Sequence, residues 1–170
     1  WQGGSDTEVL LEALSAWGLS STLKKVEGMF AFALWDSVDG KLFLARDRFG
    51  EKPLYYGWIE NMFVFASELS AFRSIPRWQR KINLNALGLF FQHNYVPDPT
   101  SIFEGVYKLP AGAFLELDQA AQKSAPENFL PTATGHAACF SPQLYWNLSE
   151  QYCSSGQDHS VLDNPKENLR

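Results

Sequence analysis

Four charged residues at the ends of apolar runs are the first candidates for chemistry in this sequence. Arg46, Asp47 and Arg48 follow one run, and Glu68 follows another. Charges placed at strand ends are typical of catalytic sites, because such sites gather groups with perturbed protonation. The same residue types also form half-buried ion pairs that fix loops. We favour this structural interpretation, in which Arg46 or Arg48 pairs with Asp47 or Glu68.

The cysteines and histidines form no recognisable metal or nucleophile pattern. Cys139 and Cys153 lie in the polar C-terminal part, and no metal-ligand spacing relates them to His93, His136 or His159. We therefore expect no metal site and two free thiols in a reducing compartment, with a disulfide between them as the alternative.

Composition excludes several classes of function. The 170 residues are 45% hydrophobic and 15% aromatic, which is enough for one domain with a core. A net charge of −5 argues against a nucleic-acid partner, which would need a basic surface. The longest apolar stretch, residues 29–35, is too short to cross a membrane. No basic segment followed by an apolar run opens the chain, so we expect no signal peptide in these residues. We therefore expect a cytoplasmic protein that binds neither nucleic acid nor a membrane.

Helix signals occur in three places. Ser5 and Glu8 form a capping box before apolar residues at helical spacing, and Gly18 is the predicted end of that helix, with a further helical turn at 22–26. A short helix is predicted at 68–73. Asn83 is the predicted cap of a helix over 84–93, whose buried side would consist of Leu87, Phe90 and Phe91.

Strand signals dominate the rest of the first 118 residues. Residues 29–36 are apolar at both alternating sets of positions, so both faces of that strand should be buried. Asp39-Gly40 predicts a tight hairpin into residues 41–46. The other predicted strands are 53–58, 62–66 and 113–117.

Hairpin connections predict antiparallel sheets with helices outside, an α+β architecture. Residues 1–118 form the predicted domain. Residues 119–170 are rich in Gln, Ser, Asn and Pro, so they form a predicted linker or tail, irregular except near residues 144–146. The chain begins at Trp1 close to a helix start, so we expect it to be a piece of a longer protein.

Several motifs together resemble one family, the class II glutamine amidotransferase domain of glutamine-dependent asparagine synthetases. They are Gly4-Ser5-Asp6-Thr7-Glu8, residues 27–36, residues 45–56, residues 65–69, Tyr95-Val96-Pro97 and residues 108–112, with Tyr145-Trp146 further on. Each motif alone is weak, but their order and spacing are specific. The resemblance covers residues 1–118.

The resemblance implies a fold and a reaction. The fold is a four-layer αββα sandwich like that of N-terminal-nucleophile hydrolases, here incomplete. The intact enzyme hydrolyses glutamine and passes ammonia to a synthetase domain, which uses ATP and magnesium to convert aspartate into asparagine. Glutamine and that synthetase domain would be the partners, with a homodimer as a further assembly of the intact enzyme. No cofactor is implied for this chain.

The resemblance also implies which residues are missing. The family's nucleophile is an N-terminal cysteine whose own amino group is the base, and an Asn-Gly pair supplies the oxyanion hole. Both precede the Ser-Asp-Thr-Glu motif in the family, and this chain does not contain them. Cys139 and Cys153 lie past the domain and could not substitute, so we predict that the 170 residues alone are inactive.

Two residues inherit a substrate role from the resemblance. Asp6 matches the aspartate that binds the glutamine α-amino group, and Gly4 would let the backbone approach the substrate. The alternative for Asp6 is that it only complements the helix dipole. Lys52 could contact the synthetase domain. Two other functions remain open: a degenerate, non-catalytic binding module, or a related synthetase with an acceptor other than aspartate.

Overall fold

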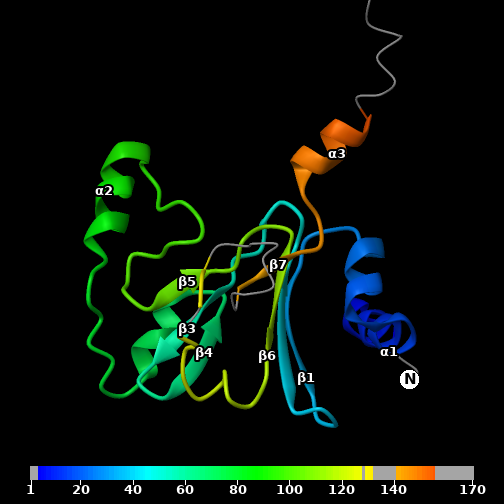
Figure 1. The fold of residues 1–170 in the computed structure, drawn as a ribbon, viewed down its shortest axis with the longest axis horizontal. Coiled ribbons are helices and arrows are strands. Elements are labelled where there is room, and N and C mark those ends of the chain that lie inside the picture. The colour runs from blue at the N-terminus through cyan, green and yellow to red at the C-terminus, as the bar shows by residue number, and fades with distance from the viewer. Residues whose placement is uncertain (1–3, 128, 132–140, 156–170) are drawn as a thin grey trace, which may run out of the picture.

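The apolar run Lys41–Arg46 forms β2, a central strand of a four-stranded antiparallel sheet (Figure 1). The computed structural model describes residues 4–127, 129–131 and 141–155. The sheet also contains β1 (Ala31–Asp36), β6 (Ala113–Leu117) and β7 (Gln143–Leu144), in the order β1-β2-β6-β7. The strands predicted around β1, β2 and β6 are therefore confirmed.

The turn between β1 and β2 is longer than the tight hairpin that the sequence predicted. Asp36 pairs with Lys41, so four residues form the loop. The Asp36 carboxylate accepts hydrogen bonds from the backbone N–H groups of Val38 and Asp39, at 2.8 and 3.1 Å. Gly40 closes the loop at φ 64°, a value that glycine adopts without strain.

A second antiparallel sheet has the order β4-β3-β5. It consists of β3 (Tyr55–Ile59), β4 (Met62–Ala66) and β5 (Val106–Lys108). The β3–β4 pair was predicted, whereas no strand was predicted at the residues of β5. Gly57 of β3 permits this pairing, because a Cβ there would lie 2.1 Å from the Gly105 carbonyl oxygen.

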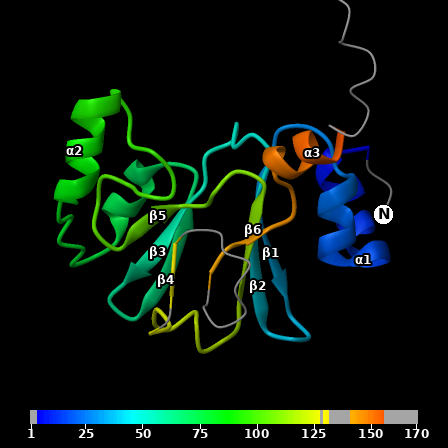
Figure 2. The same ribbon diagram turned by 45° about the horizontal axis from the view of Figure 1, so that its top comes forward.

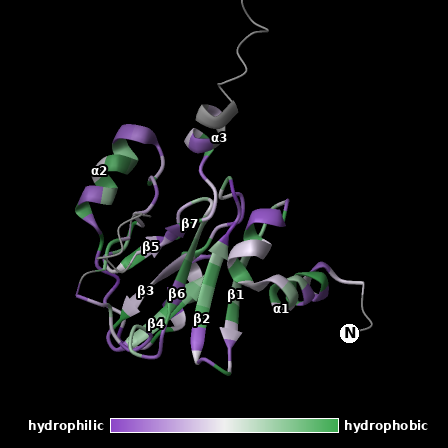
Figure 3. Ribbon diagram, turned by 45° about the vertical axis from the view of Figure 1, so that its right-hand side comes forward, coloured by the Kyte–Doolittle hydropathy of each residue, from purple (hydrophilic) through white to green (hydrophobic). Residues whose placement is uncertain are grey.

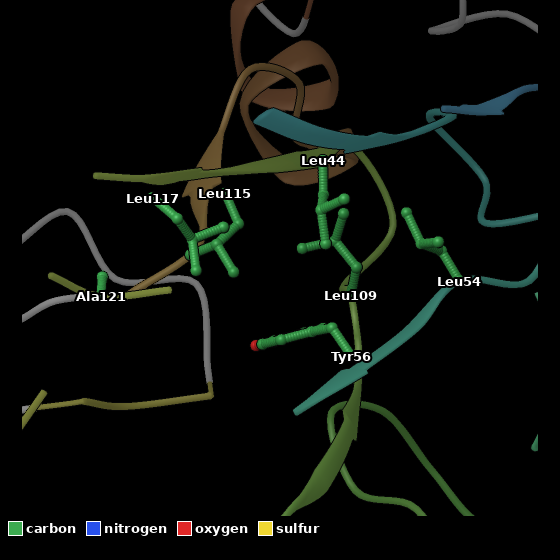
Figure 4. Close-up of a cluster of buried hydrophobic side chains, with 7 residues drawn as sticks. All are labelled: Leu44, Leu54, Tyr56, Leu109, Leu115, Leu117 and Ala121. Atoms are coloured by element: carbon green, nitrogen blue, oxygen red, sulfur yellow. The ribbon is translucent and has the colours of Figure 1, made fainter. Parts of the chain in front are cut away.

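The main core lies between the two sheets (Figure 4). Leu44 of β2 and Leu115 and Leu117 of β6 point toward Leu54, Leu109 and Tyr56 on the opposite side. These side chains are at most 4% exposed. Each fully buried leucine stabilises the fold by about 1.5–3 kcal/mol, so this layer holds the sheets together.

Helices and loops cover the outer faces of the two sheets (Figure 2). α1 (Asp6–Lys25) buries Leu23 against Ala45 of β2. On the other side, the 3₁₀ helix η1 (Leu69–Ser74) buries Phe72 against Ile59 and Val64. The result is a mixed α/β domain with two antiparallel sheets, as predicted.

Two predictions about burial are wrong. β1 is an edge strand of its sheet, so it is only partly covered, and Trp35 is 52% exposed. α2 (Leu84–His93) begins at Asn83 as predicted, with the Asn83 side chain accepting from the Ala86 N–H at 3.1 Å. It stands beside the sheets without packing closely against them (Figure 1). Phe90 and Phe91 therefore remain exposed.

Part of the predicted tail is ordered against the first sheet. Tyr145 follows β7, is 9% exposed, and its hydroxyl donates to the Arg46 carbonyl at 2.9 Å. Beyond it lies α3 (Leu148–Ser155), a helix that the sequence analysis did not anticipate. Cys139 and residues 156–170 lie outside the described residues. Within the described part of the chain, none of the helices is long and apolar enough to span a membrane.

Candidate functional site

Arg46 lies at the end of β2, where it joins three segments of the chain. The residue is 8% exposed. Its guanidinium donates to the carbonyl oxygens of Lys52, Gly50 and Leu109, at 2.9, 2.6 and 2.7 Å. It also forms an ion pair with Asp98 at 3.1 Å. All three guanidinium nitrogens are therefore engaged within the protein, which gives Arg46 a structural role.

Asp47, the next residue, organises the loop that follows β2. Its carboxylate accepts from the backbone N–H groups of Phe49, Glu51 and Lys52, at 3.1, 2.9 and 2.9 Å. Burial on its own would raise the pKa of Asp47, but these amide hydrogen bonds outweigh it and hold the pKa below its usual value. The carboxylate is thus a fixed anion at the centre of a turn.

The predicted ion pairs are wrong in their partners. Arg46 pairs with Asp98, because Asp47 is already occupied by backbone amides. Arg48 turns toward α1 and donates to the Lys24 carbonyl at 3.0 Å. Glu68 follows β4 and is exposed, and its carboxylate accepts from the Ser70 hydroxyl at 2.8 Å. Arg46 and Asp47 thus hold the same loop after β2, whereas the side chains of Arg48 and Glu68 make their contacts elsewhere. The four charges do not form one catalytic cluster.

Asp6 lies on the first turn of α1, and its carboxylate is solvent-accessible. Ser5 caps the helix as predicted, accepting from the Glu8 N–H at 3.3 Å. One Asp6 oxygen, Oδ1, accepts from the Thr7 N–H at 2.8 Å. Within the described part of the chain, no hydrogen bond or ion pair engages Oδ2. Gly4 is exposed, and a Cβ there would meet nothing within 4 Å.

This arrangement can bind a cation but provides no nucleophile. An exposed carboxylate with one free oxygen suits an ammonium group, which can donate to it. No group of three or more His, Cys, Asp or Glu side chains able to hold a metal occurs among the residues with described positions. A cavity of about 460 Å³ opens between residues 59–62 and 75–77, and none of the predicted site residues lines it.

Tyr145 contacts the end of β2, a role that was not predicted from the sequence. It packs against the end of β2 through its hydroxyl bond to the Arg46 carbonyl. Burial raises the pKa of its phenol, as does the neighbouring Asp47 charge. Its apolar neighbours Leu144 and Trp146 made this short segment visible in the sequence, but its contact with β2 spans 99 residues and has no local signal.

Comparison with known proteins gives the class of domain. Residues 1–129 match the family described as "Glutamine amidotransferase domain". Because this match covers most of the 170 residues, the chain belongs to that family.

Curated relatives narrow the resemblance. The chain is 38% identical over 117 residues to a "Putative asparagine synthetase [glutamine-hydrolyzing] 2" of Methanocaldococcus jannaschii, covering 68% of this chain and 22% of the relative. It is 34% identical over 119 residues to "Asparagine synthetase [glutamine-hydrolyzing] 2" of Bacillus subtilis, covering 67% and 16%. An "Amidase chry2" of Gibberella zeae is 34% identical over 116 residues, covering 66% and 16%.

These relatives confirm the resemblance to glutamine-hydrolysing asparagine synthetases. The chain spans about a fifth of the length of the relatives it matches.

Proposed function

We propose that this chain is part of the glutamine-hydrolysing half of an asparagine synthetase. In this proposal it belongs to a longer protein, the complete polypeptide, which hydrolyses glutamine to glutamate and ammonia. The observation that carries the proposal is the continuous family match over residues 1–129, together with relatives named as glutamine-hydrolysing asparagine synthetases. The two antiparallel sheets with a leucine core between them are consistent with the four-layer sandwich of the N-terminal-nucleophile fold.

Asp6 is the proposed glutamine contact within these residues. Its free Oδ2 would accept from the α-ammonium group of glutamine, while the Thr7 N–H holds the other oxygen. A carboxylate held through one oxygen keeps the other oxygen available to the substrate. Gly4, two residues earlier, leaves open space in which glutamine can approach the protein backbone. The role of the chain is thus to orient glutamine, and the cleaving cysteine would come from outside these residues.

The second half of the reaction would take place in a synthetase domain. ATP and magnesium would activate aspartate there, because the chain itself has no pyrophosphate-binding Ser-Gly-Gly motif. In this proposal, Arg46, Asp47 and Glu68 have structural roles only. The proposed location is the cytoplasm, where both substrates are available.

A related synthetase with a different acceptor is the second candidate. The observation that favours it is the relative named "Amidase chry2", which matches over nearly the same length as the asparagine synthetases. Acceptor choice would lie in the synthetase domain, so residues of this chain would do the same work in either case.

The test is a product assay on the complete polypeptide supplied with glutamine, aspartate, ATP and magnesium. The proposal predicts that glutamate, asparagine, AMP and pyrophosphate appear in equal amounts. Glutamate release without asparagine would favour the other acceptor. If neither glutamate nor asparagine forms, the chain is a non-catalytic module and the proposal is wrong. The 170-residue chain alone is the negative control, which we expect to release no glutamate.

A further inference from the structure

The two halves of α1 are held in different ways. The second half, from Leu19 onward, packs Leu23 into the cluster on the outer face of the first sheet. No residue in the first half, from Asp6 to Trp17, is buried. Asp6 therefore lies at the far end of a helical segment that makes little direct contact with the sheets. Its position depends on the angle between the two halves.

A bend at Gly18 sets that angle (Figure 3). Gly18 has φ 74° and ψ 168°, a combination that essentially only glycine adopts. A Cβ at this position would meet nothing within 4 Å. A substitution at Gly18 would therefore change the backbone direction without causing a steric clash. Its effect on activity would then report the change of direction and not a clash.

Two contacts across the bend keep the halves together. The Thr22 hydroxyl donates to the Ala13 carbonyl at 2.9 Å, and Thr22 is fully buried. The Lys25 ammonium lies 4.0 Å from the centre of the Trp17 ring. In a straight α-helix, residues nine apart, such as Ala13 and Thr22, are separated by about 13 Å along the axis, and residues eight apart, such as Trp17 and Lys25, by about 12 Å. Neither contact could form over these distances without the bend. Both contacts thus depend on the conformation of Gly18.

We propose that the bend at Gly18, held by Thr22, positions the Asp6 carboxylate for the α-amino group of glutamine. Gly18 and Thr22 are then positioning residues, which act through Asp6 and do not touch the substrate. This inference rests on the proposed function of Asp6. It adds that the affinity of the domain for glutamine depends on the backbone conformation of Gly18, which ends the helical half that begins at Asp6.

The experiment compares four variants in the complete polypeptide, assayed for synthesis with glutamine and, separately, with ammonia. Gly18→Ala straightens or redirects the helix, and Thr22→Val removes the hydroxyl while keeping the shape. Thr22→Ser keeps the hydroxyl and removes only the methyl group. Gly88→Ala is the matched control, since a Cβ at Gly88 of α2 also meets nothing within 4 Å.

We expect kcat/KM for glutamine to fall about 10- to 100-fold in Gly18→Ala, mainly through KM, because a displacement of about 1 Å costs up to about 100-fold. Thr22→Val should show a smaller loss of kcat/KM for glutamine, and Thr22→Ser, which keeps the hydroxyl, should retain most of the parent value. Ammonia-dependent synthesis should stay within about twofold of the parent in every variant, because ammonia does not use Asp6. Equal losses with glutamine and with ammonia would mean a purely structural role and would overturn the inference.

A double-mutant cycle with Asp6→Asn separates this inference from the proposed function. If Gly18 acts through Asp6, Gly18→Ala should cost little further activity once Asp6 is Asn. Additive losses would overturn the positioning role while leaving Asp6 as a glutamine contact. An unchanged glutamine rate in Asp6→Asn alone would refute the contact and the inference together. Should Gly18→Ala fail to fold, Thr22→Val in the same cycle gives the same decision.

Discussion

Replacing Arg46 with methionine should loosen the loops at the end of β2 while leaving the sheets intact. Methionine keeps an apolar stem at this position but is shorter than arginine and removes every donor. The carbonyl groups of Lys52, Gly50 and Leu109 would lose their partner, and the Asp98 ion pair would disappear. The loss is local because these acceptors lie in two loops and at the end of β5.

The size of the effect follows from the contacts. A hydrogen bond to a charged group contributes about 1.5–3 kcal/mol. Opening of the loops would let water reach some of the carbonyl groups, so we count two bonds at the lower end, which gives about 3 kcal/mol. Asp98 adds little, because its side chain is 37% exposed and Lys108 also lies 3.5 Å from it.

Hydrogen exchange of the complete polypeptide measures this local stability directly. About 3 kcal/mol corresponds to an exchange rate about 100-fold faster. The informative amides are those of Gly50 and Gly112, which both donate to the Asp47 carbonyl. Asp98→Asn is the matched control and should accelerate exchange by less than about fivefold. Equal acceleration in the two variants would refute the reasoning, since it would make the half-exposed ion pair as important as the buried carbonyl contacts.

Three further predictions concern stability. The lowered pKa of Asp47 stabilises the fold above the usual carboxyl pKa, and this contribution is lost as pH falls through the lower, folded-state pKa; Asp47→Asn should flatten the acid limb of a urea-midpoint profile, and an unchanged limb would contradict the assignment. Gly57→Ala should cost about 3 kcal/mol or more, because its Cβ would meet the Gly105 carbonyl at 2.1 Å, whereas Gly88→Ala should not destabilise in the same denaturation experiment. The isolated 170-residue chain should bind a hydrophobic dye or aggregate, because aromatic side chains such as Phe91 and Trp35 are exposed; a monodisperse monomer that melts cooperatively would disprove this.

Local patterns in the sequence predicted most of the elements. Asn83 marked the start of α2, and apolar runs next to turn residues located β2 and β4 to the residue. The capping box at Ser5 and the break at Gly18 were also readable, because capping and positive φ are properties of a few adjacent residues. β5 escaped detection since it has three residues and owes its pairing to the space that Gly57 leaves.

Tertiary contacts could not be predicted in the same way. Apolar periodicity placed Phe91 inside, but periodicity says which residues share a face and not whether anything covers that face. Likewise, the partners of Arg46 lie 4 to 63 residues away, and only the fold decides between them and Asp47. The Asp6 assignment came from the motif, and the proposed glutamine contact uses the carboxylate oxygen that the Thr7 N–H leaves available.

The most direct test of the central claim is the effect of Asp6→Ala on asparagine synthesis by the complete polypeptide. We predict that glutamine-dependent synthesis slows, because transition-state binding weakens by about 2–5 kcal/mol, the cost of truncating one partner of a desolvated charge pair. Ammonia-dependent synthesis should be retained. Glu12→Ala, an exposed acid on the same half of α1, should change neither rate. Unchanged kinetics with glutamine in the Asp6→Ala variant would contradict the account.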